Sequence, residues 1–96
     1  MADHGWIITA DKIEDGLQVG TMGPHNISAE VEAALLAGKG TCWKAYDDDG
    51  EHYYSGRYYA PKGTGREFAP LDDFCAPNAG ATELRYRQAD GTWVSL

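Results

Sequence analysis

The segment Asp47-Asp48-Asp49-Gly50 constrains the fold more than any other, because it joins two stretches with strand composition. Residues 41–46 and 51–60 are rich in aromatic side chains, which fit a half-buried pleated surface, and Asp-Gly is a strong turn signal. Pro61 ends the second stretch, since proline has no N–H to donate to a β-ladder. The sequence therefore predicts a β-hairpin over residues 41–60.

A second hairpin is predicted over residues 82–96, around the turn Ala89-Asp90-Gly91. A three-residue loop with Gly91 in the left-handed conformation places Tyr86 opposite Val94 and separates apolar from polar side chains. The same loop length in the first hairpin pairs Tyr46 with His52.

One α-helix is predicted over about residues 29–37. Ser28 can cap its N-terminus, and an i, i+3, i+4 stripe of Val31, Ala34 and Leu35 gives it one apolar side. A further helical turn is expected at 68–74. With a first strand at 5–9, the fold class is α+β: a single globular domain (1–96) with one helix packed on a mostly antiparallel sheet of four to five strands.

The net charge of the chain limits the classes of partner that it is expected to bind. Fifteen acidic residues against eight basic ones give a net charge of −7, and the basic residues are scattered along the sequence. Because binding to nucleic acid or anionic lipid depends on clustered Lys and Arg, we expect no direct nucleic-acid binding and no membrane association. The N-terminal sequence MADHGWII lacks a basic region and a long apolar run, which favours a cytoplasmic protein with reduced cysteines.

The first hairpin concentrates negative charge at its tip, and we expect this tip to dock on a basic surface of another protein. The carboxylates concerned are Asp47, Asp48, Asp49 and Glu51, with Asp72 and Asp73 expected on the same rim. In size and charge the chain resembles small acidic inhibitors from phages and other mobile elements, such as anti-restriction and anti-CRISPR proteins. The resemblance is one of composition, and it assigns no site residue.

Residues 51–60 contain four of the six tyrosines, and strand alternation divides them into two pairs on opposite faces. The face expected to be buried holds Cys42, Lys44, Tyr46, His52, Tyr54 and Tyr58. The outward face would then offer amphipathic side chains typical of binding hot spots. These outward residues are Trp43, Tyr53, Arg57 and Tyr59.

From the sequence we expect no catalytic, metal or cofactor site. Cys42 lies four residues, roughly 13 Å along a strand, from the position paired with His52, and the histidines lack metal-ligand spacing. A non-enzymatic protein-binding module is therefore favoured. One alternative is a small-ligand-binding protein or small enzyme with a cleft between the sheet and the 61–81 loop. Another is a homodimer formed through an exposed strand edge.

Overall fold

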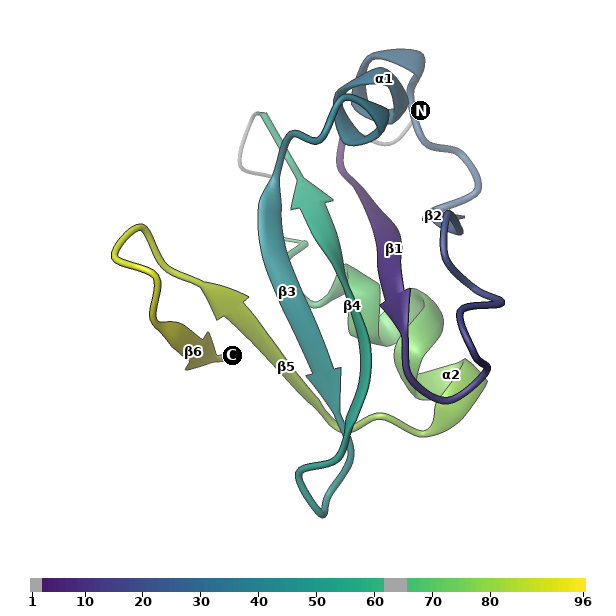
Figure 1. The fold of residues 1–96 in the computed structure, drawn as a ribbon. Coiled ribbons are helices and arrows are strands. Elements are labelled where there is room, and N and C mark those ends of the chain that lie inside the picture. The colour runs from purple at the N-terminus through teal and green to yellow at the C-terminus, as the bar shows by residue number, and fades with distance from the viewer. Residues whose placement is uncertain (1–2, 62–65) are drawn as a thin grey trace.

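The computed structural model of the chain describes residues 3–61 and 66–96. Six strands form one open antiparallel sheet in the order β2-β1-β4-β3-β5-β6 (Figure 1). The strands are β1 (Gly5–Asp11), β2 (Met22–Gly23), β3 (Thr41–Tyr46), β4 (His52–Tyr59), β5 (Glu83–Arg87) and β6 (Trp93–Ser95). The helical elements are α1 (Ala29–Leu36), a π-helical turn η1 (Leu71–Cys75) and α2 (Ala76–Ala79). The α+β class and both hairpins are confirmed, whereas the strand count and the short α2 exceed the prediction.

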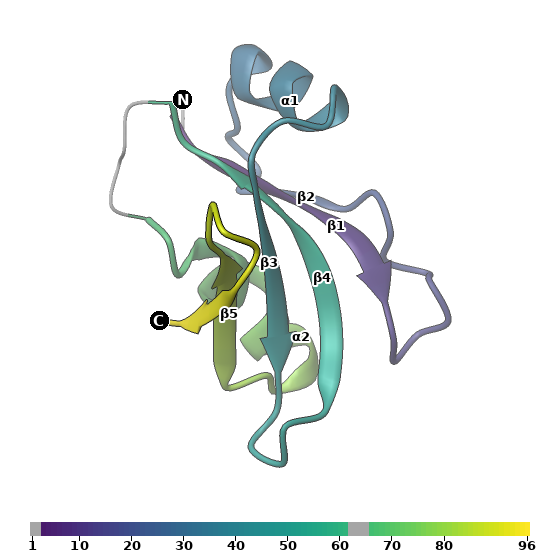
Figure 2. The same cartoon turned by 60° about the vertical axis from the view of Figure 1, so that its left-hand side comes forward.

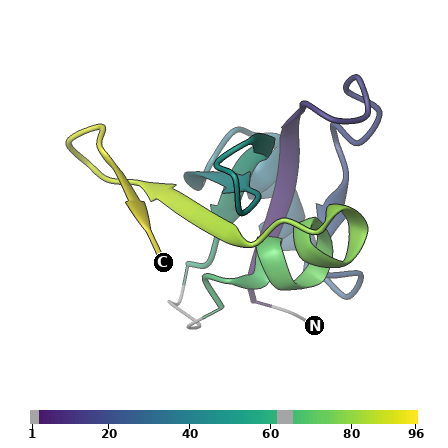
Figure 3. The ribbon, with the colours of Figure 1, turned by 90° about the horizontal axis from the view of Figure 1, so that it is seen from below.

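The two faces of the sheet are covered unequally. The η1–α2 segment packs on one face, and α1 packs on the opposite face, where it contacts β1 and β4 (Figures 1 and 2). The larger core, under η1 and α2, includes Trp6, Ile8, Trp43, Ala45, Tyr54, Tyr58, Leu71, Cys75, Leu84 and Tyr86. The smaller core, under α1, is Ile7, Val31 and Leu35. Seen from below, the β5–β6 hairpin projects away from the helices, so part of the sheet stays uncovered (Figure 3).

Helix α1 forms where the sequence predicts it. The Ser28 hydroxyl accepts a hydrogen bond from the N–H of Val31 at 3.2 Å, which satisfies an amide that the first turn leaves unpaired. Gly38 follows the helix with φ of 88°, a left-handed conformation that glycine adopts without a Cβ clash. The predicted buried stripe, Val31, Ala34 and Leu35, is confirmed.

Both predicted three-residue loops are present. In the first hairpin the N–H of Asp47 donates to the carbonyl of Glu51 at 3.0 Å, and Gly50 is left-handed with φ of 78°. In the second, Tyr86 lies opposite Val94, and Gly91 has φ of 89°. Turn chemistry therefore fixed both loops, since a left-handed glycine closes this loop type.

A β-bulge at Tyr53 changes which side chains of β3 are buried. Tyr46 pairs with His52 as predicted, but Ala45 pairs with Tyr54, so Tyr53 is an extra residue in β4. Each β3 side chain therefore lies on the opposite face from the predicted one, so the expectation that Cys42, Lys44 and Tyr46 share the core with Tyr54 and Tyr58 is wrong. The prediction that Trp43 points outward is wrong: its side chain is 0% exposed.

The bulge keeps the charged Lys44 side chain out of the core, where its burial would cost free energy. Without it, the ammonium of Lys44 would lie on the face covered by η1 and α2, where desolvation opposes a cation. With it, Trp43 fills that core and Lys44 lies on the open face. The carbonyl of Tyr53 accepts the N–H of Lys12 at 2.9 Å, so the extra residue remains hydrogen-bonded.

Candidate functional site

The acidic tip, defined as Asp47, Asp48, Asp49 and Glu51, lies on a turn held by its own first residue. The Asp47 carboxylate accepts the N–H of Asp49 at 2.9 Å and that of Glu51 at 2.8 Å. The hydrogen bond from the Glu51 amide, with help from the Tyr53 hydroxyl, keeps the pKa of Asp47 below its ordinary value. Asp47 thus organises the turn, and the exposed side chains of Asp48, Asp49 and Glu51 project from it.

Asp72 and Asp73 are exposed but lie away from the tip. The indole Nε1 of Trp6 donates to Oδ2 of Asp73 at 3.0 Å, and Trp6 pairs with Tyr58 near the far end of β4. Tyr58 is six residues from His52, which begins β4 beside the tip, a separation of roughly 20 Å along the strand. The expectation that Asp72 and Asp73 share the rim of the tip is therefore wrong.

The other residues predicted to face outward do not form a patch. Arg57 donates from Nη2 to the carbonyl of Leu35 at 2.6 Å. This hydrogen bond provides a donor for a carbonyl in the last turn of α1, where the helix itself leaves carbonyls without partners. Tyr59 is half-buried against Ile7 and the α1 residues. Tyr53 is half-buried at the bulge, where the hydrogen bond to Asp47 raises the pKa of its hydroxyl. Arg57 and Tyr59 thus contact α1, whereas Tyr53 lies at the bulge, so none of the three is a free binding residue.

An open basic face lies on β3, β5 and β6, and the sequence did not reveal that Lys44 and Tyr46 belong to it. We use this name for Lys44, Arg85 and Arg87 together with the rings of Tyr46 and Trp93, all on the side opposite η1 and α2. The Lys44 ammonium lies 4.4 Å from the centre of the Trp93 ring, and the Arg85 guanidinium lies 4.2 Å from that of Tyr46. Cation–π contacts of this kind stabilise charges that would otherwise repel one another.

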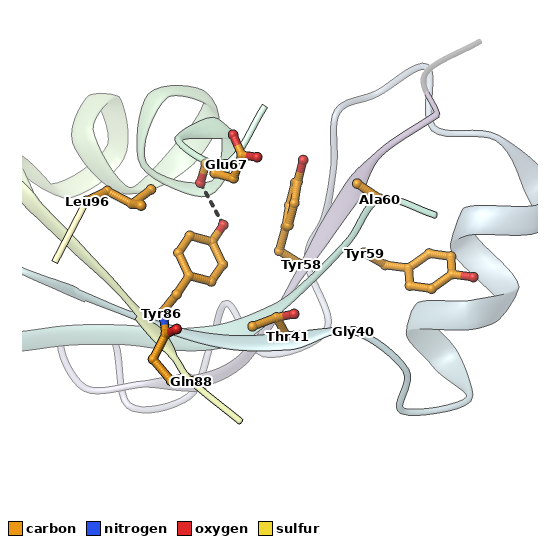
Figure 4. A pocket seen from close by; sticks show the side chains of 9 residues that line it. All are labelled: Gly40, Thr41, Tyr58, Tyr59, Ala60, Glu67, Tyr86, Gln88 and Leu96. Carbon is orange, nitrogen blue, oxygen red and sulfur yellow. Dashed lines mark hydrogen bonds between the residues drawn. The ribbon is translucent and has the colours of Figure 1, made fainter. Parts of the chain in front are cut away.

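A hollow of about 560 Å³ opens between the sheet and the segment that precedes η1 (Figure 4). Its wall includes Tyr58 and Tyr86, with Glu67 and Leu96 at its sides, whereas the Tyr59 ring points away toward α1 (Figure 4). The Tyr86 hydroxyl donates to the carbonyl of Glu67 at 2.6 Å, and burial raises the pKa of that hydroxyl. This hollow corresponds to part of the cleft expected beside the 61–81 loop, of which residues 62–65 lie outside the described residues.

The cysteines and His52 are not arranged as catalytic groups: the Cys75 thiol is buried, and His52 is hydrogen-bonded within β4. Both thiols are free, and burial raises the pKa of Cys75 to about 12, so this thiol stays protonated at neutral pH. Nε2 of His52 lies 2.9 Å from the carbonyl of Tyr54 and 2.7 Å from the Ser55 hydroxyl. Burial lowers the pKa of His52, the hydrogen bond with the Tyr54 carbonyl opposes this effect, and Lys44 and Lys12 lower the pKa further. The net lowering favours the neutral imidazole.

Within residues 3–61 and 66–96, no group of three or more His, Cys, Asp or Glu side chains is placed to hold a metal ion. Nor does any helix in these ranges have the length and apolar character needed to cross a bilayer. Comparison of the chain with protein-family models, with curated proteins and with solved structures finds no match.

Proposed function

We propose that this chain is a small non-enzymatic protein-binding module whose acidic tip docks on a basic surface of another protein. One observation carries the proposal: Asp47 fixes the turn through two backbone hydrogen bonds, while three carboxylates stay exposed. A surface already held in its binding shape loses less conformational entropy on association. The clustered charge would also accelerate encounter with a basic partner. An inhibitor that covers a nucleic-acid-binding surface is one role this arrangement suits.

Charge reversal at the tip should weaken binding to a basic probe. In the tip variant, Asp48, Asp49 and Glu51 become lysine, and Asp47 stays because it holds the turn. Each lost contact between exposed charges contributes up to about 1 kcal/mol, so the dissociation constant for a labelled oligolysine peptide should rise about tenfold or more. Fluorescence anisotropy in low salt measures this change, and added NaCl should weaken the wild-type complex.

A matched variant distinguishes the effect of the acidic tip from the effect of the net charge. Changing Asp3, Glu67 and Asp72 to lysine also reverses three exposed carboxylates, but away from the tip. The control variant should keep most of the wild-type affinity for oligolysine. An equal loss in both variants would show that the probe responds only to total charge, and the tip would then have no special role.

The hollow beside Tyr58 and Tyr86 supports a second candidate, a small-ligand-binding protein. Its volume of about 560 Å³ falls within the range of small-molecule sites, and aromatic walls with a few polar groups are typical of such sites. A ligand bound at a hundred times its dissociation constant should stabilise the fold by about 2.7 kcal/mol, which raises the melting temperature. A thermal-shift screen of aromatic metabolites measures this, with Tyr86→Phe and Leu96→Ala as site variants. If no compound shifts the melting temperature, this candidate fails.

A further inference from the structure

The basic face holds three cations, of which one has an ion-pair partner in the part of the chain that the structure describes. Lys44 lies directly opposite Arg85 on the neighbouring strand, and like charges in such cross-strand pairs destabilise a sheet. Glu83 pairs with Arg85, whose side chain is 37% exposed. Among the described residues, neither Lys44 nor Arg87 makes an ion pair. An anion placed over this face would therefore relieve a repulsion that the free protein carries.

Two further cations border the face. Lys12 lies close enough to His52 to lower the pKa of that imidazole, after the larger effect of burial and together with Lys44. Arg57 lies opposite Cys42 on the neighbouring strand, at the end of the face covered by α1. Lys44, Arg85 and Arg87 therefore form a local cluster of cations in a chain whose net charge is −7.

From this arrangement we infer that the basic face binds a short acidic segment of a partner protein, laid in extended form across β3 and β5. In an extended segment, alternate side chains project to the same side about 6.6–6.8 Å apart. Two carboxylates at that spacing can each meet a cation of the face. The ammonium of Lys44 keeps its N–H donors available while it lies over the Trp93 ring.

The occupied aromatic rings favour carboxylates over nucleic acid. Proteins that bind single-stranded nucleic acid without sequence preference stack bases on aromatic side chains. Here Lys44 already covers Trp93, Arg85 already covers Tyr46, and both rings are half-buried. The acidic tip follows Tyr46 directly and α1 lies toward the other end, so a long polyanion would meet negative charge at the tip (Figure 1). A short acidic segment avoids that repulsion.

The test compares a face variant with a charge-matched control. The face variant is Lys44→Glu with Arg87→Glu, and the control is Lys39→Glu with Arg66→Glu, two exposed cations elsewhere. For a labelled short oligoglutamate peptide, the dissociation constant should rise about tenfold in the face variant and change much less in the control. The tip variant described above should keep oligoglutamate binding, so this inference and the proposed function can fail separately.

A second variant distinguishes the loss of charge from a loss of folding. Lys44→Gln with Arg87→Gln removes charge without adding repulsion, and its melting temperature shows whether the fold persists. Failure of the wild type to bind oligoglutamate, or an equal loss in face variant and control, overturns the inference. So does tighter binding of a thymidine oligonucleotide of similar length. A salt-sensitive increase in solution mass that the face variant abolishes would identify a second copy of this chain as the occupant instead.

Discussion

Gly56→Ala should lower the free energy of unfolding by about 3 kcal/mol, because added atoms in a filled core force neighbours out of place. A Cβ at Gly56 would lie 2.0 Å from the carbonyl oxygen of Ile7 and 2.5 Å from Cζ2 of Trp43. The first contact is with the backbone of β1, which pairs with β4 here and cannot simply rotate away. Urea denaturation followed by far-UV circular dichroism measures the change.

A second glycine supplies the control. Gly50 lies in the hairpin turn with φ of 78°, and no atom lies within 4 Å of where its Cβ would be. Gly50→Ala should therefore cost about 1 kcal/mol, the penalty of a left-handed alanine without a clash. If Gly56→Ala costs no more than Gly50→Ala, the close packing of Ile7 and Trp43 around Gly56 is incorrect, and with it the register of β4 against β1 and β3.

Asp11→Ala should destabilise the protein by a similar amount, about 3 kcal/mol. The Asp11 side chain is buried, and its Oδ1 accepts the N–H groups of Ile13 at 3.0 Å and Glu14 at 2.9 Å. Its Oδ2 accepts the N–H of Gln18 at 3.0 Å. Alanine would leave these three amides without their acceptor. Urea denaturation measures the loss, and the exposed Asp3→Ala should show almost none.

The same carboxylate should make stability depend on pH. Burial alone would raise the pKa of Asp11, but the three backbone hydrogen bonds outweigh it and hold the pKa below its ordinary value. A lowered folded-state pKa means that the stabilisation is complete above the unfolded value of about 3.9 and is lost as pH falls through the folded value. The stability difference between wild type and Asp11→Asn should therefore shrink on acidification. A difference that stays constant would exclude this role.

Local signals in the sequence were sufficient for the hairpins and for α1. Gly50, Gly91 and Ser28 each act on their immediate neighbours, so the loop lengths and the helix start follow from short stretches. The structural role of Asp11 was not predicted, because in the sequence an aspartate before a polar loop looks like an ordinary solvent-exposed residue. The Asx-turn preference of aspartate was the signal available for it, since Asp11 accepts from the amide two residues ahead.

The faces of β3 could not be read from the sequence. Their assignment depends on the bulge at Tyr53, whose carbonyl accepts the N–H of Lys12, a residue far away in the sequence that directly follows β1. The basic face depends in addition on β3 lying beside β5, which brings Lys44 next to Arg85 across about forty residues of sequence. The Lys12–Tyr53 contact and the β3–β5 pairing join residues that are far apart in the sequence. The alternation of side chains along one strand does not predict either of them.

The chain is proposed to bind partners through two separate surfaces of opposite charge, the acidic tip and the basic face. The most direct measurement is a ¹H–¹⁵N NMR titration of the labelled protein, once with oligolysine and once with oligoglutamate. Oligolysine should shift the amides of Asp48, Asp49 and Glu51, whereas oligoglutamate should shift those of Lys44 and Arg87 and the indole N–H of Trp93. Overlapping or evenly spread shifts from the two peptides would contradict the claim.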